Sequence, residues 1–331
     1  MRLGTILGTL LGLGLLAWLL RAYGVLPVLD LLHRAGWAVV PVILVHVIQI
    51  AFSAAAWRAI AGHSTPRLGL GAFVVLRWIR EAVNTLLPVA QVGGDVAAIR
   101  LLRRRGMAFA RAIASCVADV TVEFVTQACF TVLGLVVLLG LVDDFRARVA
   151  AFGAAALATA AACGLVFAQR LGLAGVVERG IGHAARAAGW DRAEEIGGLH
   201  GTLMALYRNR GEVVAAACWH GVSWLIGAGE VWLALRALGH TVGLGPALVI
   251  ESLGQALRSS GFAVPGAVGV QEGGYVAVCS LFGTAPDVAI ALSLMKRLRE
   301  VVLGLPALPI WLRLETVTEP ARSRARHPLS R

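Results

Sequence analysis

Long apolar runs, each about the length of a membrane-spanning helix, dominate the chain. They lie at residues 4–20, 36–57, 107–141, 149–168, 211–236 and 287–312. A helix of about 20 mainly apolar residues crosses the hydrocarbon core of a bilayer, so each run is typical of a transmembrane helix. The first run lacks a following small-residue cleavage site, and we interpret it as a retained span rather than a signal peptide. The pattern predicts an all-α, polytopic membrane protein with about six full spans.

Two further apolar stretches, 68–100 and 247–283, are interrupted by LLPVAQVGGD and AVPGAVGVQEGG. Each interruption sets a proline ahead of glycines and an acidic side chain. Proline removes a backbone donor and glycine loosens a helix, so both stretches are predicted to break. A broken helix at membrane depth must be buried in protein or line a polar cavity, and paired breaks in two halves indicate a transport site. The candidate residues are Pro88, Gly93, Gly94 and Asp95, and Pro265, Gly269, Gln271, Glu272 and Gly273.

Arginine clusters predict the orientation of the chain. They occur at 100–111, in the polar segment 169–210 and in the tail 315–331, and basic loops stay on the cytoplasmic side. Both termini are then cytoplasmic. The broken stretches enter from opposite faces as re-entrant hairpins, which would form an inverted repeat. The alternative is that the breaks are ordinary kinks and the repeat is chance. We expect one transmembrane domain over residues 1–314, with 169–210 as an amphipathic surface segment.

Charged residues inside the apolar segments share helix faces. Asp119, Glu123 and Gln127 follow one another at four-residue steps. A charge at the bilayer centre costs about 2.5–3.5 kcal/mol, so these groups are expected to converge on a shared polar interior. Buried ion pairs that only lock helices together are the alternative. The same one-sided pattern recurs in Arg77, Arg80, Glu81 and Asn84, in Glu251, Gln255 and Arg258, and in Lys296, Arg297, Arg299 and Glu300.

Composition excludes several other classes of protein. Apolar residues make up 58% of the chain, charged residues 15%, and the mean hydropathy is +0.77, which no soluble domain could bury. The net charge of +11 resides in short loops, so we expect no nucleic-acid partner. The five cysteines show no disulfide or metal spacing. No enzyme motif occurs in a supporting context, so we expect a non-enzyme without metal or cofactor.

Several motifs together resemble a known family. NTLLPVAQVGGD, ASCVADVTVEFVTQ, SLGQALRSSGFAVPGAVGVQEGGY and LSLMKRLREVVLGLP are similar to the lysylphosphatidylglycerol synthase transmembrane family, whose members are described as flippase-like. The resemblance covers about residues 35–312. The residues of these motifs are most similar to those of the hopanoid-biosynthesis-associated members. It implies lipid movement; with the chain ending at Arg331, we expect no aminoacyl-transferase domain.

The residues and the resemblance together predict a lipid transporter in the bacterial cytoplasmic membrane. The headgroup of a hopanoid or phospholipid would cross a polar cavity between the broken helices while its tails stay in the bilayer. Basic groups such as Arg77 and Arg258 would bind phosphate or hydroxyl groups, and Asp119, Glu123 and Glu272 would bind a cation or proton. One alternative is a non-transporting accessory protein for lipid-modifying enzymes. Another is an enzyme that uses Asp119 and Glu123 as acid and base. Self-association is left open.

Overall fold

The computed structural model describes residues 18, 21, 25–62, 68–87, 92–142, 153, 159–169, 198–260, 264 and 267–317. These residues form helices and no strands. Thr159–Gln169 is a further short apolar helix. The labelled elements are α2 (Val25–Ala35), the 3₁₀ turn η1 (Gly36–Ala38), α3 (Val39–Ala61), α4 (Leu70–Leu86), α5 (Gly93–Arg104), α6 (Phe109–Leu141), α9 (Leu199–Arg208), α10 (Arg210–Ala237), α11 (Leu244–Ser260), α12 (Val270–Ser280) and α13 (Pro286–Val317).

Two helical stretches of the described chain, Leu29–Ala61 and Phe109–Leu141, have the length and apolar composition that suit a membrane crossing. They coincide with the predicted spans 36–57 and 107–141. Helices α10 and α13, with 28 and 32 residues, occupy the predicted spans at 211–236 and 287–312 but carry more polar side chains. Trp18 is the one described residue of the predicted first span, and 159–168 is the main described part of the fourth.

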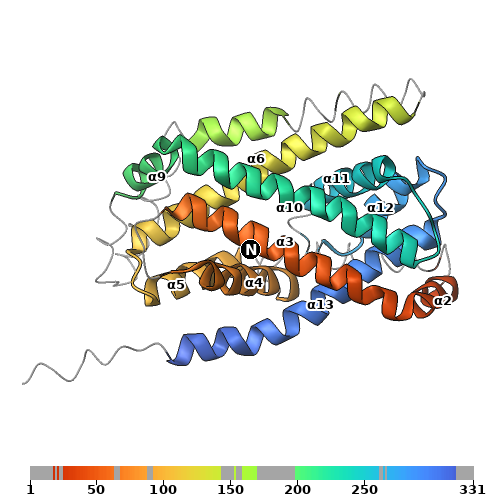
Figure 1. The fold of residues 1–331 in the computed structure, drawn as a ribbon, viewed down its shortest axis with the longest axis horizontal. Coiled ribbons are helices and arrows are strands. Elements are labelled where there is room, and N and C mark those ends of the chain that lie inside the picture. Colours follow the sequence, from red (N-terminus) through yellow and green to blue (C-terminus); the bar gives the residue numbers. More distant parts are fainter. Residues whose placement is uncertain are drawn as a thin grey trace, which may run out of the picture.

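The long helices α3 and α10 run antiparallel and pack side by side (Figure 1). Phe52 contacts Trp219 across this pair, with ring centroids 5.5 Å apart. His46 lies 3.4 Å from Glu230 further along. The two broken stretches pack against this pair: α4 of the first contacts α3, and α11 of the second contacts α10.

Both interrupted stretches fold back on themselves. In the first, Arg105 at the end of α5 donates a hydrogen bond of 3.5 Å to the carbonyl of Ala72 at the start of α4. In the second, Gly254 of α11 packs against Tyr275 of α12. The predicted breaks at 86–95 and 263–274 therefore separate the limbs of two helical hairpins. Pro88 and Pro265 lie outside the described residues.

The two hairpins open toward opposite ends of the bundle. Arg111 at the start of α6 donates a hydrogen bond of 2.9 Å to the carbonyl of Ala61. The open end of the first hairpin, where Arg105 meets Ala72, therefore lies where α3 ends and α6 begins. His240, just after α10, hydrogen-bonds Thr284 at 3.0 Å, which places the other opening where α10 ends. Figure 1 shows α5 and α9 at one end and α2 at the other.

Apolar packing forms two cores, one toward each end. The first gathers residues such as Trp57 and Phe73 around α3, α4 and α6. The second gathers residues such as Ile250 and Leu292 around α10, α11 and α13. Helix α6 contributes residues up to Val122 to the first core and residues from Leu135 on to the second. The middle of the bundle is thereby left to polar side chains.

Part of the predicted surface segment 169–210 is also described. Helix α9 buries Leu199, Leu203 and Leu206 on one face, against α6, and is amphipathic as its apolar spacing requires. Residues 170–197 lie outside the described chain. Helix α13 continues to Val317, so the first residues of the predicted tail are helical. Arg104 bonds to Glu315 there, which ties the end of α13 to the end of α5.

Candidate functional site: a polar cavity among buried ion pairs

The arginines of α4 bind the acidic stripe of α6. Arg80 is 6% exposed, and its guanidinium lies 2.6 Å from Asp119 and 2.7 Å from Asp95 of α5. Arg77 makes a two-pronged ion pair with Glu123, one contact of which measures 2.8 Å. Asp119 and Glu123 are four residues apart, and Arg77 and Arg80 are three residues apart. Both spacings place the two side chains of a helix on the same face, so the two faces can meet. The first hairpin is therefore held to α6 by charge.

A buried histidine of α10 joins this cluster. His220 of α10 is buried, and its Nε2 lies 3.0 Å from Asp119. Potential ligand atoms of Asp119, Glu123 and His220 lie within 4.8 Å of one another, a spacing that could suit a cation. The two carboxylates already receive the guanidinium groups of α4, however. The arrangement therefore favours an ion-pair network over a metal site.

The first break is closed by backbone and side-chain contacts. The amide of Gly94 donates a hydrogen bond of 2.7 Å to the side-chain oxygen of Asn84. Gly94 also approaches the backbone of Arg80 so closely that a side chain would not fit. Asp95 follows at the third position of α5, where its carboxylate accepts from Arg80. Gly93 is the first residue of α5.

The second break repeats this placement of an acidic residue. Glu272 is the third residue of α12 and is fully buried. It accepts from Arg297 at 2.5 and 3.2 Å, from Ser293 at 3.0 Å, and from the amide of Gly269 at 2.6 Å. Gly269 has φ +79°, a conformation that favours glycine. Gln271 donates 2.8 Å to Ser293. The amide of Gly273 continues the helix by bonding to the carbonyl of Gly269.

A fully buried ion pair joins the second hairpin to α13. The ammonium of Lys296 lies 2.5 Å from Glu251 of α11, and each residue is 1% exposed. Glu251 also accepts from Tyr275 at 3.2 Å and from Gln255 at 3.0 Å. These extra bonds matter because a buried pair offsets its lost hydration only when the remaining polar groups are satisfied.

Further pairs connect α13 to α11 and α10. Arg258 binds Glu300, and Arg299 binds Glu230 while lying 3.6 Å from Glu300. Glu230 was not anticipated from the sequence. It is 1% exposed and sits between the two halves of the chain, since its other neighbour is His46 of α3.

The contacts of α3 were also missed by sequence reasoning. The ring of His46 hydrogen-bonds Glu81 at 2.6 Å and Gln49 at 2.8 Å. Gln49 donates 3.1 Å to the carbonyl of Ser223 on α10. The available signal was that His46, Gln49 and Ser53 share one face of an otherwise apolar run, and intramembrane polar residues tend to be functional.

A polar cavity of about 240 Å³ lies at the centre of these pairs. Helices from both halves line it, including both limbs that precede the breaks, α4 and α11. The described lining residues are His46, Gln49, Ile50, Ser53, Arg77, Glu81, Thr85, Glu123, Gln127, Ser223, Trp224, Glu251, Gln255, Arg258, Ser259, Arg299 and Glu300. Arg80, Asn84, Asp95, Asp119, Lys296, Arg297 and Glu272 belong to the surrounding ion-pair and hydrogen-bond network.

The basic groups expected to bind a lipid headgroup all have carboxylate partners. This holds for the predicted set of Arg77, Arg80, Arg258, Lys296, Arg297 and Arg299. A sequence can place a cation on a helix face but cannot show which acid meets it. The cavity wall is consequently a mixed surface of paired charges.

Comparison with known proteins identifies one match. The family model described as the lysylphosphatidylglycerol synthase TM region matches residues 5–307. Neither a curated protein nor a solved structure matches the chain.

Proposed function

Because the chain belongs to the lysylphosphatidylglycerol synthase transmembrane-region family, it is a multi-pass integral membrane protein, and we propose that it moves a polar-headed lipid between bilayer leaflets. The observation that carries this proposal is the 240 Å³ polar cavity in the middle of the bundle. Charged side chains are costly at membrane depth, and they commonly mark a substrate pathway. A cavity of this kind offers a headgroup a route that avoids hydrocarbon.

The opposed hairpins support an alternating mechanism. One opens where α3 ends and the other where α10 ends, as an inverted repeat of two re-entrant units would require. Asp95 and Glu272 occupy equivalent positions, because each is the third residue of the helix that follows a break. Movement of one hairpin relative to the α3–α10 pair would expose the cavity to one side of the membrane at a time.

Paired charges in the wall suit a site that binds and releases a headgroup. A phosphate can take the place of Glu123 or Glu300 on its arginine, and an amine or hydroxyl group can bond to the carboxylate that is freed. Such an exchange keeps charges compensated throughout. We infer transport rather than headgroup chemistry, since Asp119 and Glu123 are engaged by guanidinium groups and are poorly placed to act as acid and base.

A second cleft offers space for apolar groups. It has a volume of about 540 Å³ and lies where α3, α4 and α10 meet, lined by Phe52, Leu70, Phe73 and Trp219, with Arg58 among the lining residues. Its composition suits acyl chains with a phosphate near the arginine. Such a lipid is a phospholipid or a hopanoid with a polar side chain. The hopanoid option rests on the resemblance of the sequence motifs.

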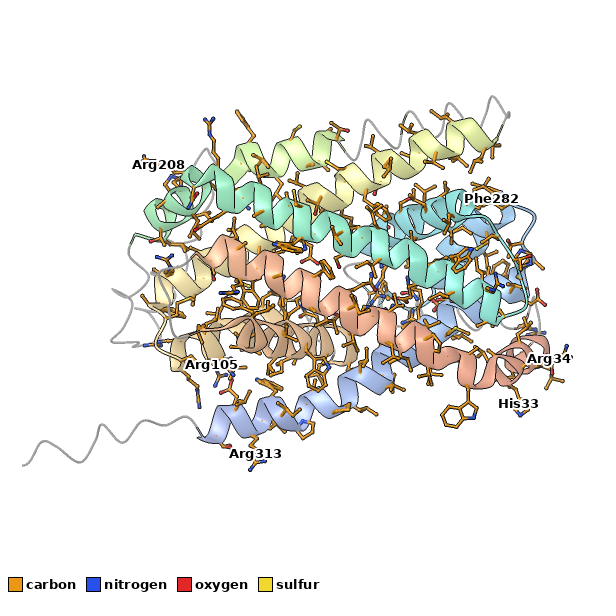
Figure 2. All side chains as sticks on the ribbon, in the orientation of Figure 1. His33, Arg34, Arg105, Arg208, Phe282 and Arg313 are labelled. Carbon is orange, nitrogen blue, oxygen red and sulfur yellow. The ribbon has the colours of Figure 1, made fainter. Side chains whose placement is uncertain are left out.

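The arginine distribution supports a cytoplasmic location for the end that carries α9. Arg105, Arg208 and Arg313 lie toward that end, whereas Phe282 and a fourth labelled arginine, Arg34, which pairs with Asp30, lie toward the opposite end (Figure 2). Basic residues concentrate on the cytoplasmic side of membrane proteins. We propose that this end faces the cytoplasm of a bacterial cell.

Reconstitution tests the proposal directly. Purified protein is placed in vesicles that carry a headgroup-labelled phospholipid in both leaflets, and a membrane-impermeant quencher reports the outer fraction over time. We expect the protein to expose the inner-leaflet pool, which protein-free vesicles do not. Lipids that co-purify with the protein, compared with those of a deletion strain, identify the substrate. An intact, folded protein that leaves the inner pool protected would support the accessory role instead.

A further inference from the structure

The hydrogen bonds around His46 require more protons than its neighbours provide. The Nε2 atom of the ring faces a carboxylate oxygen of Glu81 at 2.6 Å, and Nδ1 faces the side-chain oxygen of Gln49 at 2.8 Å. Both of these atoms accept hydrogen bonds. A neutral imidazole carries only one N–H and can satisfy only one of them.

The orientation of Gln49 is determined by its other contact. Its amide nitrogen donates 3.1 Å to the backbone carbonyl of Ser223, which can only accept. Reversing the amide would place two oxygens against each other at that position. Gln49 therefore presents its oxygen to His46, and the ring needs a hydrogen on Nδ1 to bond to it.

We propose that His46 and Glu81 together hold one exchangeable proton, and that release of this proton unlocks the movement of the lipid headgroup. The proton resides on the ring, which is then an imidazolium that donates to the carboxylate of Glu81 and to Gln49. Each short contact then has one donor and one acceptor. The second half of the inference rests on the proposed lipid transport.

The charges that face the ring favour a bound proton. The nearest additional group is Glu230 of α10, whose second oxygen lies 3.4 Å from Nδ1 and has no hydrogen-bond partner among the described residues. Carboxylates outnumber guanidinium groups here, and an excess of negative charge stabilises a positive imidazolium. The charged groups around His46 are Glu81 and Arg77 from α4, Glu230 from α10, and Arg299 and Glu300 from α13.

The site can exchange its proton with the cavity. His46 and Glu81 both line the 240 Å³ space, and their side chains are 12% and 30% exposed. In this respect they differ from the Lys296–Glu251 pair, whose members are each 1% exposed. A proton held by His46 and Glu81 therefore has a polar route out of the site.

Loss of the proton would weaken contacts among three helices. His46 connects α3 to α4 through Glu81 and to α10 through Glu230. A neutral ring leaves one acceptor without a donor and leaves Glu81 and the buried Glu230 without a cation between them. One polar contact between α4 and α3 is then lost, which favours the movement of the α4 limb that alternating access requires.

The proton site is tested without any transport measurement. Protein with ¹⁵N-labelled histidine is placed in lipid nanodiscs, and NMR spectra are recorded between about pH 5 and pH 9. The signal missing from His46→Gln assigns the ring. We expect a hydrogen on both nitrogens at the acidic end and loss of one as the pH rises, and Glu81→Gln should move this transition to lower pH. A ring that stays neutral throughout, or a transition unaffected by Glu81→Gln, would overturn the proton site.

Coupling is tested by the vesicle assay with equal pH on both sides. The wild-type rate should rise with pH by about tenfold per unit while the site is mainly protonated, as mass action for one proton requires. His46→Gln should flatten this dependence, and Glu81→Gln should shift it to lower pH. The control is His240→Gln, because His240 lies in a turn where it bonds to Thr284, outside the cavity lining.

The outcomes separate this inference from the proposed function. A wild-type rate that is flat or falls with pH, or one that His46→Gln leaves equally pH-dependent, would overturn coupling while lipid transport stands. Absence of transport at every pH would remove both transport and its coupling. The NMR titration would still decide whether His46 and Glu81 bind the proton.

Discussion

Replacement of Gly94 by alanine should separate the two limbs of the first hairpin. A Cβ atom at this position would lie 2.8 Å from the carbonyl carbon of Arg80 and 2.9 Å from Cγ of Asn84. Side-chain carbons almost never approach heavy atoms more closely than 3.0 Å. The nearest obstacle is backbone, which cannot rotate away, so α4 and α5 must move apart.

The size of the effect follows from two losses. Overpacking at a close helix contact costs about 1–3 kcal/mol. The separation also stretches the 2.7 Å bond from the Gly94 amide to Asn84, which contributes about 1 kcal/mol. Alanine also favours a helix over glycine by about 1 kcal/mol, so we expect Gly94→Ala to lower the free energy of unfolding by about 1–3 kcal/mol in total. The Arg80–Asp95 pair across the same contact should loosen with it.

Unfolding by sodium dodecyl sulfate in mixed micelles, followed by circular dichroism, measures this change. The matched control is Gly71→Ala in the same hairpin, because a Cβ there meets nothing within 4 Å. Alanine favours a helix over glycine by about 1 kcal/mol, so Gly71→Ala should leave stability unchanged or raise it. If Gly94→Ala were as stable as Gly71→Ala, the close approach of α4 and α5 would be refuted.

Three other changes test further parts of the structure. Lys296→Met should lower the free energy of unfolding by about 3–5 kcal/mol by leaving Glu251 as a buried charge, and adding Glu251→Gln should recover most of it; equal losses in the single and double variants would argue against the pair. Glu272→Gln should weaken four hydrogen bonds and lower both stability and lipid movement, whereas unchanged values for both would show that the second break does not depend on this carboxylate. In a cysteine-free background, Arg208→Cys should react with impermeant maleimide only after cell lysis and Ser280→Cys in intact cells; labelling of both in intact cells would contradict the orientation.

The broken stretches and the acidic stripe could be predicted from the sequence because their signals are local. Proline and glycine change the backbone where they stand, and Asp119 and Glu123 share a helix face through their spacing alone. The structure places these two carboxylates against the arginines of α4, inside the bundle.

The polar contacts of α3 and α10 could not be predicted, because they depend on pairing between distant helices. His46 and Glu81 are 35 residues apart, and Gln49 and Ser223 are 174 residues apart. A single polar residue in an apolar run gives no sign of its partner. Periodicity also cannot reveal whether a buried arginine is paired, so the complete pairing of the predicted cations was visible only in three dimensions.

Blocking the cavity offers the most direct test of lipid movement through it. Ser259 lines the polar cavity and is exposed at its edge, whereas the adjacent Ser260 is exposed but absent from the described lining. Vesicles containing wild-type protein, Ser259→Trp or Ser260→Trp are compared for movement of headgroup-labelled phospholipid at equal protein content. We expect the wild type and Ser260→Trp to move lipid at similar rates and Ser259→Trp to lose most of the activity while remaining folded. Wild-type rates in Ser259→Trp would show that the lipid headgroup does not pass through this cavity.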